Sequence, residues 1–298
     1  MHSIEAGGVI VVDKPEGWTS HDVVGRMRRL AGTRRIGHLG TLDPIATGVL
    51  PLVVGRATRL AQFFTRNDKV YEAVIRLGWS TDSYDRSGVP TSPESAPSLD
   101  RDALDRLLDA WRGRYSQVPP PVSAKKVGGV PAYKLARKNV AVELAPVDVE
   151  MYELALSGFD GTELRVRAHC SAGTYMRSIA HELGIAAGCG AHLQDLRRTA
   201  SGDFQIEHAR TIEQLQALAA EGRIAEALVP SARLLPDLPT HYADDTAAAR
   251  IRQGRDFPVS PFRQHPNSRY VKAVTREGEL IAIGELKLAN VCHPVVVL

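Results

Sequence analysis

The most unusual acidic residue in this sequence is Asp43, because it lies in the mostly apolar segment Thr41–Gly48. Pro44 follows it and favours an extended backbone at Asp43. In one interpretation the carboxylate hydrogen-bonds the backbone of the next turn, as aspartates before prolines commonly do. In the other, it is a nucleophile held on a rigid turn at the edge of the core. The local sequence leaves both interpretations open.

A basic block surrounds the approach to Asp43. Between Val23 and Leu42 the chain has five arginines and one histidine but no acidic residue, although the net charge of the whole chain is only +3. Such a block is typical either of a solvated helix face or of a surface that binds phosphates. Its members are Arg26, Arg28, Arg29, Arg34, Arg35 and His38.

The common signatures of cofactor-dependent and metal-dependent enzymes are missing from the sequence. It contains no GxGxxG, GxxxxGK[ST], HExxH or GxSxG motif. His181-Glu182 lacks the following PCxxC of a zinc deaminase. The segment 37–40 has the GxxG form of a KH loop, but the residues after it start a helix poorly, which disfavours that fold.

The composition is that of an ordinary globular protein. With 298 residues, 44% of them hydrophobic, the chain is long enough for about two domains. Its three distant cysteines argue against a disulfide framework or a structural zinc site and fit a reducing cytoplasm. We see no signal-peptide pattern and no apolar stretch near 18 residues, so we expect a cytoplasmic protein without a membrane span.

Hydrophobic periodicity predicts the elements that must position these residues. It predicts strands at residues 9–12, 49–54, 71–77 and 164–170, and the last short ones at 270–274, 279–283 and 295–298. Helices are predicted after the N-cap candidates Thr19 and Ser20, from Ser98 through Trp111, over 176–187, and after a capping box of Thr211 and Gln214. The proline-rich segment 230–239 is the best linker candidate.

The segment from Arg35 to Leu50, RIGHLGTLDPIATGVL, closely resembles the catalytic motif of the TruB family of bacterial tRNA pseudouridine-55 synthases. Five further segments match the family in the same order, at residues 13–20, 69–71, 123–126, 173–177 and 190–198. The resemblance extends from about residue 9 to residue 230, and a sixteen-residue match around Asp43 is very specific.

This resemblance implies an enzyme that isomerises one uridine in the T-loop of tRNA, without cofactor or metal. The glycosidic bond breaks, the uracil turns, and a bond forms to its carbon 5. Asp43 is then the nucleophile or base on the target nucleotide, and addition to the uracil ring and action at the ribose both remain open. Arg177 matches the arginine that pairs with this aspartate, and Tyr71 matches the tyrosine that packs on the uracil and helps to move its proton.

The resemblance also implies residues that bind the RNA. His38 matches the histidine that fills the stack vacated by the flipped base, and Tyr175 and Leu196 match positions that line the base pocket. The family's lysine aligns with Lys126, while Lys125 stands where the family usually has an apolar residue. Lys14 and Arg35, within matching motifs, complete the predicted substrate-binding set, and two or three of the five arginines are expected to contact T-arm phosphates.

We therefore predict an α+β protein with two domains. Residues 1–230 would form a catalytic domain with a mixed, largely antiparallel sheet flanked by helices, the pseudouridine synthase fold. Within it, residues 115–150 would form a thumb-like RNA-binding insertion. Residues 240–298 would form a small C-terminal β-barrel, a short PUA-like RNA-binding domain that resembles its family counterpart only weakly.

The expected partner is the T-arm of tRNA, bound by a monomer that requires no protein partner and no membrane. Three alternatives are weighed against this function: a chaperone that opens and refolds the T-arm, a pseudouridine synthase for another RNA, and an acid-dependent hydrolase. The hydrolase is the weakest, because the sequence offers no second positioned carboxylate near Asp43.

Overall fold

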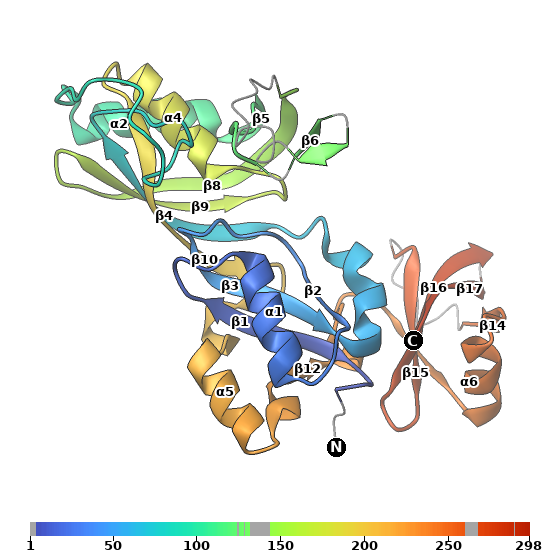
Figure 1. Cartoon of the computed structure of the whole chain (residues 1–298). Helices are drawn as coiled ribbons and strands as arrows, with labels where there is room; N and C mark the ends of the chain where they lie inside the picture. Colours follow the sequence, from blue (N-terminus) through green and yellow to red (C-terminus); the bar gives the residue numbers. More distant parts are fainter. Residues whose placement is uncertain (1–3, 124, 128, 132–143, 260–267, 289) are drawn as a thin grey trace.

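One large mixed sheet forms the body of the molecule, and a smaller sheet packs beside it (Figure 1). The computed structural model describes residues 4–298 except 124, 128, 132–143, 260–267 and 289. The path through the large sheet is β12-β1-β3-β10-β4-β9-β8-β5, with β2 beside β3 and β11 beside β10. Along this path only β3 and β10 pair in parallel, so the predicted α+β class with a largely antiparallel sheet is confirmed.

The strands of the large sheet are β1 (Gly8–Lys14), β2 (Ile36–His38), β3 (Thr47–Val54), β4 (Lys69–Leu77), β5 (Gly113–Gln117), β8 (Val147–Phe159), β9 (Glu163–Cys170), β10 (Ala191–Ser201), β11 (Phe204–Gln205) and β12 (Leu228–Pro230). A separate two-stranded pair is formed by β6 (Lys126–Val127) and β7 (Val130–Pro131). The ends of the predicted insertion, in β5 and β8, are thus paired strands at the edge of the main sheet.

In the described part of the chain, four α-helices cover the large sheet and close its main core: α1 (Ser20–Leu30), α2 (Arg101–Leu108), α4 (Met176–Ala186) and α5 (Ile212–Ala220). Short 3-10 helices connect the strands: η1 (Gly55–Phe64), η2 (Asp109–Trp111), η3 (Ile206–His208), η4 (Ile224–Ala227) and η5 (Ser231–Arg233). Each α-helix buries an apolar stripe against the sheet, as its periodicity predicted.

Helix starts follow the capping chemistry of the sequence. Thr19 caps α1 and exchanges hydrogen bonds with Asp22 in a capping box. Thr211 and Gln214 form the predicted capping box of α5. The prediction that Ser98 caps the next helix is wrong, because Asp100 accepts the Ala103 N–H at 2.8 Å and α2 begins at Arg101. The last turn of that predicted helix is the 3-10 helix η2.

The smaller sheet contains β13 (Thr240–Ala243), β15 (Tyr270–Thr275), β16 (Leu280–Leu288), β17 (Val291–Val297) and β14 (Phe257–Pro258), in that order, with α6 (Asp245–Arg252) against it. Sequence periodicity found the three longer strands but missed β13, α6 and β14, which are short. This curled sheet fits the predicted PUA-like fold, and Figure 1 places it next to η1.

The two sheets share a hydrophobic core. Alternate residues of β1 and β3 face opposite sides of the large sheet, so Ile10 and Leu50 join the main core while Val9 and Val53 join a second core. Residues of β15, β16 and β17 complete this second core. The segment 230–239 is packed as well, since Leu234 is buried in the second core. No helix in the described residues is long and apolar enough to cross a membrane.

Candidate active site

Asp43 lies on the turn between β2 and β3, and several elements hold that turn in place. Ser20, the first residue of α1, bonds both the N–H and the carbonyl of Leu42, at 2.8 and 3.1 Å. The Pro44 carbonyl accepts the Gly17 N–H at 2.8 Å. The residues that match the family near positions 13–20 therefore support the turn that carries Asp43.

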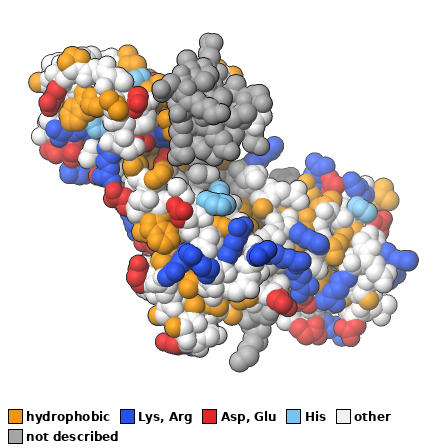
Figure 2. All heavy atoms as spheres, in the orientation of Figure 1, with side chains coloured by type: hydrophobic (Ala, Val, Ile, Leu, Met, Phe, Trp, Pro, Cys, Tyr) orange, Lys and Arg blue, Asp and Glu red, His pale blue; other side chains and the backbone are white. Residues whose placement is uncertain are grey.

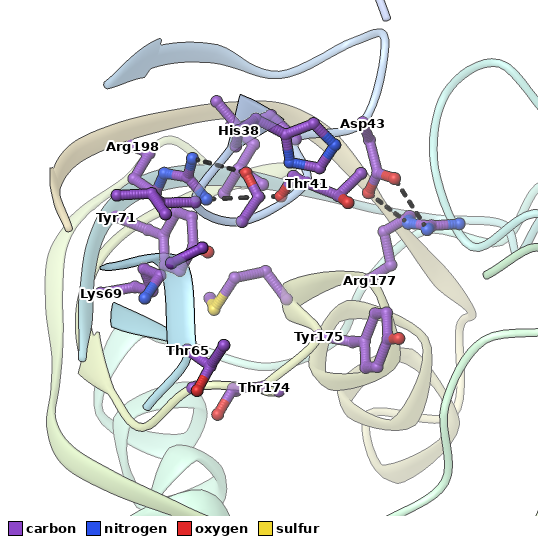
Figure 3. A pocket seen from close by; sticks show the side chains of 18 residues that line it. His38, Thr41, Asp43, Thr65, Lys69, Tyr71, Thr174, Tyr175, Arg177 and Arg198 are labelled. Atoms are coloured by element: carbon purple, nitrogen blue, oxygen red, sulfur yellow. Dashed lines mark hydrogen bonds and ion pairs between the residues drawn. The ribbon is translucent and has the colours of Figure 1, made fainter. Parts of the chain in front are cut away.

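The carboxylate of Asp43 faces Arg177, at the start of α4. Oδ2 accepts from Nε at 2.9 Å and Oδ1 from Nη2 at 3.1 Å, a bidentate pair (Figure 3). Arg177 is 4% exposed, whereas the Asp43 side chain is 32% exposed. Since both oxygens face the guanidinium, the interpretation as a local turn cap does not describe this carboxylate. The bidentate pair fixes the direction of the Asp43 carboxylate, as a nucleophile or base requires.

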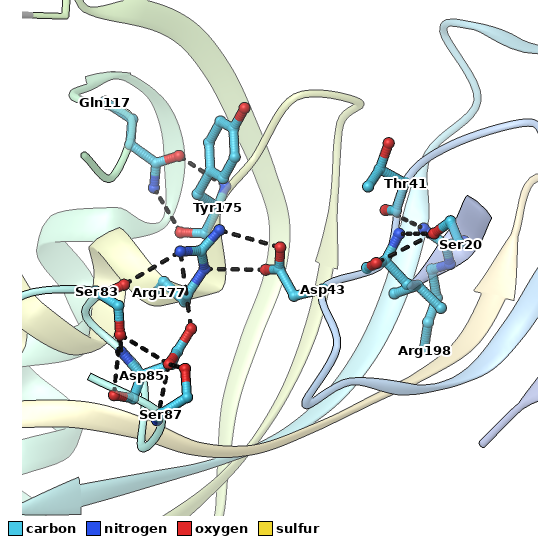
Figure 4. Close-up of polar contacts among 11 residues, drawn as sticks. Ser20, Thr41, Asp43, Ser83, Asp85, Ser87, Gln117, Tyr175, Arg177 and Arg198 are labelled. Carbon is cyan, nitrogen blue, oxygen red and sulfur yellow. Dashed lines mark hydrogen bonds and ion pairs between the residues drawn. The ribbon is translucent and has the colours of Figure 1, made fainter. Parts of the chain in front are cut away.

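A second carboxylate holds Arg177 from its other side. Nη1 donates to the Ser83 carbonyl at 3.1 Å and lies 3.7 Å from Asp85 Oδ2 (Figure 4). Asp85 is buried and accepts hydrogen bonds from the hydroxyls of Ser83 and Ser87. The sequence-based statement that no second carboxylate is positioned near Asp43 is therefore wrong. Asp85 faces the arginine and not the open side of Asp43, so the two acids are not arranged as a hydrolase pair.

A cavity of about 370 Å³ opens beside Asp43. This is within the range of pockets for single small ligands, about 300–1,000 Å³. Tyr71 from β4 is 8% exposed, and burial raises the pKa of its phenol, so the hydroxyl keeps its proton at neutral pH. The lining includes six of the nine predicted site residues, namely His38, Asp43, Tyr71, Tyr175, Arg177 and Leu196, together with Lys69 and Arg198 (Figure 3).

Arg198 also lines this cavity, although no role was predicted for it. It is 1% exposed, and its guanidinium donates to the carbonyls of Val49, Thr41 and Gly40 at 2.7, 3.3 and 3.2 Å. It thereby joins the loop that precedes Asp43 to β3. Its position in the matching motif at 190–198 was the available signal, but its partners are backbone atoms, which leave no pattern in a sequence.

The positive charge of Arg198 affects two neighbours. Burial and this guanidinium lower the pKa of His38, so its ring is neutral at pH 7, and its Nδ1 has no hydrogen-bond partner in the described structure. Burial, with a smaller effect of Arg198, lowers the pKa of Lys69 to about 8. The cavity therefore contains a neutral imidazole, and a lysine that loses its proton more easily than usual.

The remaining predicted substrate-binding residues are Lys14, Lys126 and Arg35, which are not among the described residues that line the cavity. Lys14 is fully buried, and its ammonium donates to the carbonyls of Pro15, Trp18 and Pro44. The prediction that Lys14 binds substrate is therefore corrected: this lysine supports the Asp43 turn. Lys126 lies in β6, but its side chain is outside the described part of the structure. Arg35 is exposed on the surface before β2.

The basic block forms an exposed cationic surface on the face of α1 and β2. Figure 2 shows Lys and Arg side chains gathered over this region and continuing toward the smaller sheet. Arg29, Arg34 and Arg35 are exposed, whereas Arg26 and Arg28 are half-buried and Arg28 donates to the Ile36 carbonyl at 3.1 Å. Phosphate contacts by two or three of the five arginines stay a prediction, and the three exposed arginines are accessible for them. Among the described residues, no group of three or more His, Cys, Asp or Glu could hold a metal ion.

The architecture is shared with solved pseudouridine synthases. The protein superposes on a chain of the archaeal box H/ACA sRNP Nop10-Cbf5 complex with a TM-score of 0.71 and 26% identity, covering 98% of this chain and 85% of that one. A chain of a Cbf5-Nop10-Gar1 complex gives a TM-score of 0.73 and 27% identity, covering 98% and 84%. Fold and site together thus define the class, a pseudouridine synthase.

Sequence comparisons identify the family within this class. The model for the N-terminal domain of TruB family pseudouridylate synthases matches residues 28–176, and that for the C-terminal domain of tRNA pseudouridylate synthase B matches residues 177–236. A tRNA pseudouridine synthase B of Solibacter usitatus is 62% identical over 98% of this chain and 99% of its own length. One from Thermobifida fusca is 42% identical over 98% of both chains. The chain belongs to the TruB family of pseudouridylate synthases.

Proposed function

We propose that this protein converts a uridine in the T-loop of tRNA, at position 55, to pseudouridine. The observation that carries the proposal is the bidentate Asp43–Arg177 pair at the wall of a cavity lined by Tyr71, in a chain of the TruB family. The relatives in Solibacter usitatus and Thermobifida fusca are both named as enzymes that act on tRNA.

The reaction is an isomerisation, so its atoms balance without a second substrate. The bond between N1 of uracil and C1′ of the ribose breaks, and a bond between C5 and C1′ forms. The proton on C5 leaves, and N1 gains a proton. Asp43 acts on the target nucleotide as its nucleophile or base, and Arg177 pairs with this carboxylate and fixes its direction. Tyr71, adjacent in the cavity, packs on the uracil and takes part in the proton transfer.

The target base must leave its stack to reach the cavity, at a cost of a few kcal/mol. We assign His38 to the vacated position in the loop, because its neutral ring lies at the rim of the cavity on β2. Tyr175 and Leu196, which also line the cavity, would contact the extruded base. Flipping and chemistry then use one continuous site.

The exposed Arg29, Arg34 and Arg35 supply phosphate contacts to the T-arm, which position the RNA without reading its sequence. We further propose that residues 115–150 form an RNA-binding thumb within a catalytic unit of residues 1–230, and that residues 240–298 form a PUA-like unit that extends the RNA surface. One T-arm fits one site, so we propose a monomer that acts in the cytoplasm without a protein partner.

Release of tritium from carbon 5 tests this function. T-arm RNA labelled at C5 of the target uridine is incubated with the wild-type protein and with Asp43→Asn. Release by the wild type alone supports both the function and the role of Asp43. Release by neither protein, with tight binding retained, would favour the chaperone or another RNA target.

A further inference from the structure

Gln117, the last residue of β5, is a buried polar side chain near the site that the mechanism does not use. It is 0% exposed. Its Oε1 accepts the Tyr175 N–H at 2.8 Å, and its Nε2 donates to the Tyr175 carbonyl at 3.1 Å (Figure 4). Nε2 also donates to the Tyr115 hydroxyl at 3.0 Å, so both of its N–H groups are used.

These bonds act at a helix start that has no cap of its own. Tyr175 is the N-cap residue of α4, and its side chain makes no capping hydrogen bond. The first N–H groups of a helix lack partners within the helix, so the first turn depends on groups from outside. The Gln117 amide fixes the peptide groups on both sides of the Tyr175 α-carbon, and thus the direction in which α4 begins.

A second bond joins the same two segments one step further along. The Ser178 hydroxyl donates to the Val118 carbonyl at 2.7 Å. Consecutive residues of one strand end, Gln117 and Val118, therefore hold Tyr175 and Ser178 on either side of Arg177. Because Arg177 also meets Asp43 in bidentate geometry, a small shift of this turn would misalign the pair.

We infer that Gln117 is a positioning residue for the reaction: it fixes Arg177, and through it Asp43, in the reactive arrangement. This inference rests on the proposed function. Two residues after Gln117 the chain reaches Pro119, and the basic segment up to residue 150 follows. The end of β5, which holds the turn around Arg177, is thus also the start of the segment that we propose to contact RNA. Gln117 itself is buried and bonds Tyr115 and Tyr175, so its effect should appear in the rate of the chemical step and not in RNA affinity.

The test uses Gln117→Met, which keeps the side-chain length but removes both polar groups, in the full-length protein. Gln205→Met is the matched control, because Gln205 is exposed and its amide reaches, among the described residues, only the Gly202 carbonyl, at 3.5 Å. The measurements are the single-turnover rate of pseudouridine formation at saturating enzyme and the Kd for unlabelled T-arm RNA. We expect Gln117→Met to lower the rate about 10-fold to 100-fold, in line with the effect of a small misplacement, with less than about threefold change in Kd.

A double-mutant cycle separates positioning from general destabilisation. If Gln117 acts through Arg177, adding Gln117→Met to Arg177→Lys should lower the rate by less than about threefold further. Full additivity of the two losses, or an unchanged rate in folded Gln117→Met, would overturn the inference. If Gln117→Met does not fold, Ser178→Ala is the second test, because it removes the hydrogen bond from Ser178 to the Val118 carbonyl. This variant must then react more slowly with an unchanged Kd, and a wild-type rate would overturn the inference. A wild type that forms no pseudouridine would instead refute the proposed function.

Discussion

Replacing Arg198 with methionine removes the guanidinium that joins the Asp43 loop to β3. Methionine is of similar length and fills most of the same space. The carbonyls of Gly40, Thr41 and Val49 then lose the hydrogen bonds that the buried arginine donates to them. Two consequences follow from this geometry: the fold loses stability, and the loop that carries Asp43 loses its fixed position.

The size of the stability loss follows from two opposing effects. A hydrogen bond to a charged group contributes about 1.5–3 kcal/mol, and Arg198 makes three to backbone carbonyls. Removing a buried charge recovers several kcal/mol of desolvation. Because two of the three bonds are long, we expect a net loss of about 3 kcal/mol, or about 5 °C in Tm for a chain of this size.

The adjacent residue provides a matched control. Arg197 pairs with Asp13 at 2.9 Å, but its side chain is 39% exposed, and such pairs contribute at most about 1 kcal/mol. Thermal unfolding and urea unfolding of Arg198→Met and Arg197→Met measure the difference, and single-turnover kinetics should show at least a tenfold slower reaction for Arg198→Met. In the same variant the pKa of His38, followed by NMR, should rise because a nearby positive charge is gone. Equal stability of the two variants would refute the reasoning.

Three further predictions concern charge. Asp43→Asn should abolish tritium release, while its affinity for T-arm RNA stays within a few-fold of wild type. If this variant still refolds tRNA, a chaperone activity is separate from catalysis. Tritium release at the wild-type rate would show that another residue is the nucleophile. Burial lowers the pKa of Lys69 from 10.5 to about 8, so the cost of burying its charge is present below pH 8 and disappears as pH rises toward 10.5. Urea midpoints should therefore show wild type gaining stability relative to Lys69→Met between pH 8 and 10.5, and a constant difference would contradict this. Changing Arg29, Arg34 and Arg35 together to glutamine should reduce the slope of log K against log salt by about two phosphate contacts, while the rate at saturating enzyme is retained. An unchanged slope would show that these arginines do not contact the RNA.

The sequence predicted the regular elements where periodicity and caps agree. Strands β1, β3, β4 and β9 and the start of α5 at Thr211 are of this kind, whereas the long strands β8 and β10 were not predicted. Ser98 was wrong as a cap because Asp100, two residues later, is an equally good acceptor and lies where the chain turns into the helix. The short α6 was missed although Asp244 precedes an alanine-rich run and caps it through the Ala247 N–H.

The residues of the site also fall into those that the resemblance to the family identified and those that it did not. The resemblance supplied Asp43 and Arg177, which are 134 residues apart and are not linked by any local pattern. It could not supply Asp85, Gln117 or the function of Arg198, because each acts on another side chain or on backbone atoms. Lys14 shows the opposite error: a lysine in a matching motif was assigned to the RNA, whereas its three carbonyl partners make it an internal support.

The core shared by the two sheets has a consequence for how the molecule comes apart. Val9 and Val53 on the large sheet belong to the same cluster as Val274, Ile283 and other residues of the smaller sheet. A protease that cut the connecting segment would break one peptide bond but would leave this apolar contact in place. The two fragments should then remain together as a nicked complex. A truncated chain that ended near residue 239 would expose the apolar residues of the second core and would be prone to aggregation. The boundary between the units in the sequence is therefore not a boundary at which the protein can be divided into independently stable parts.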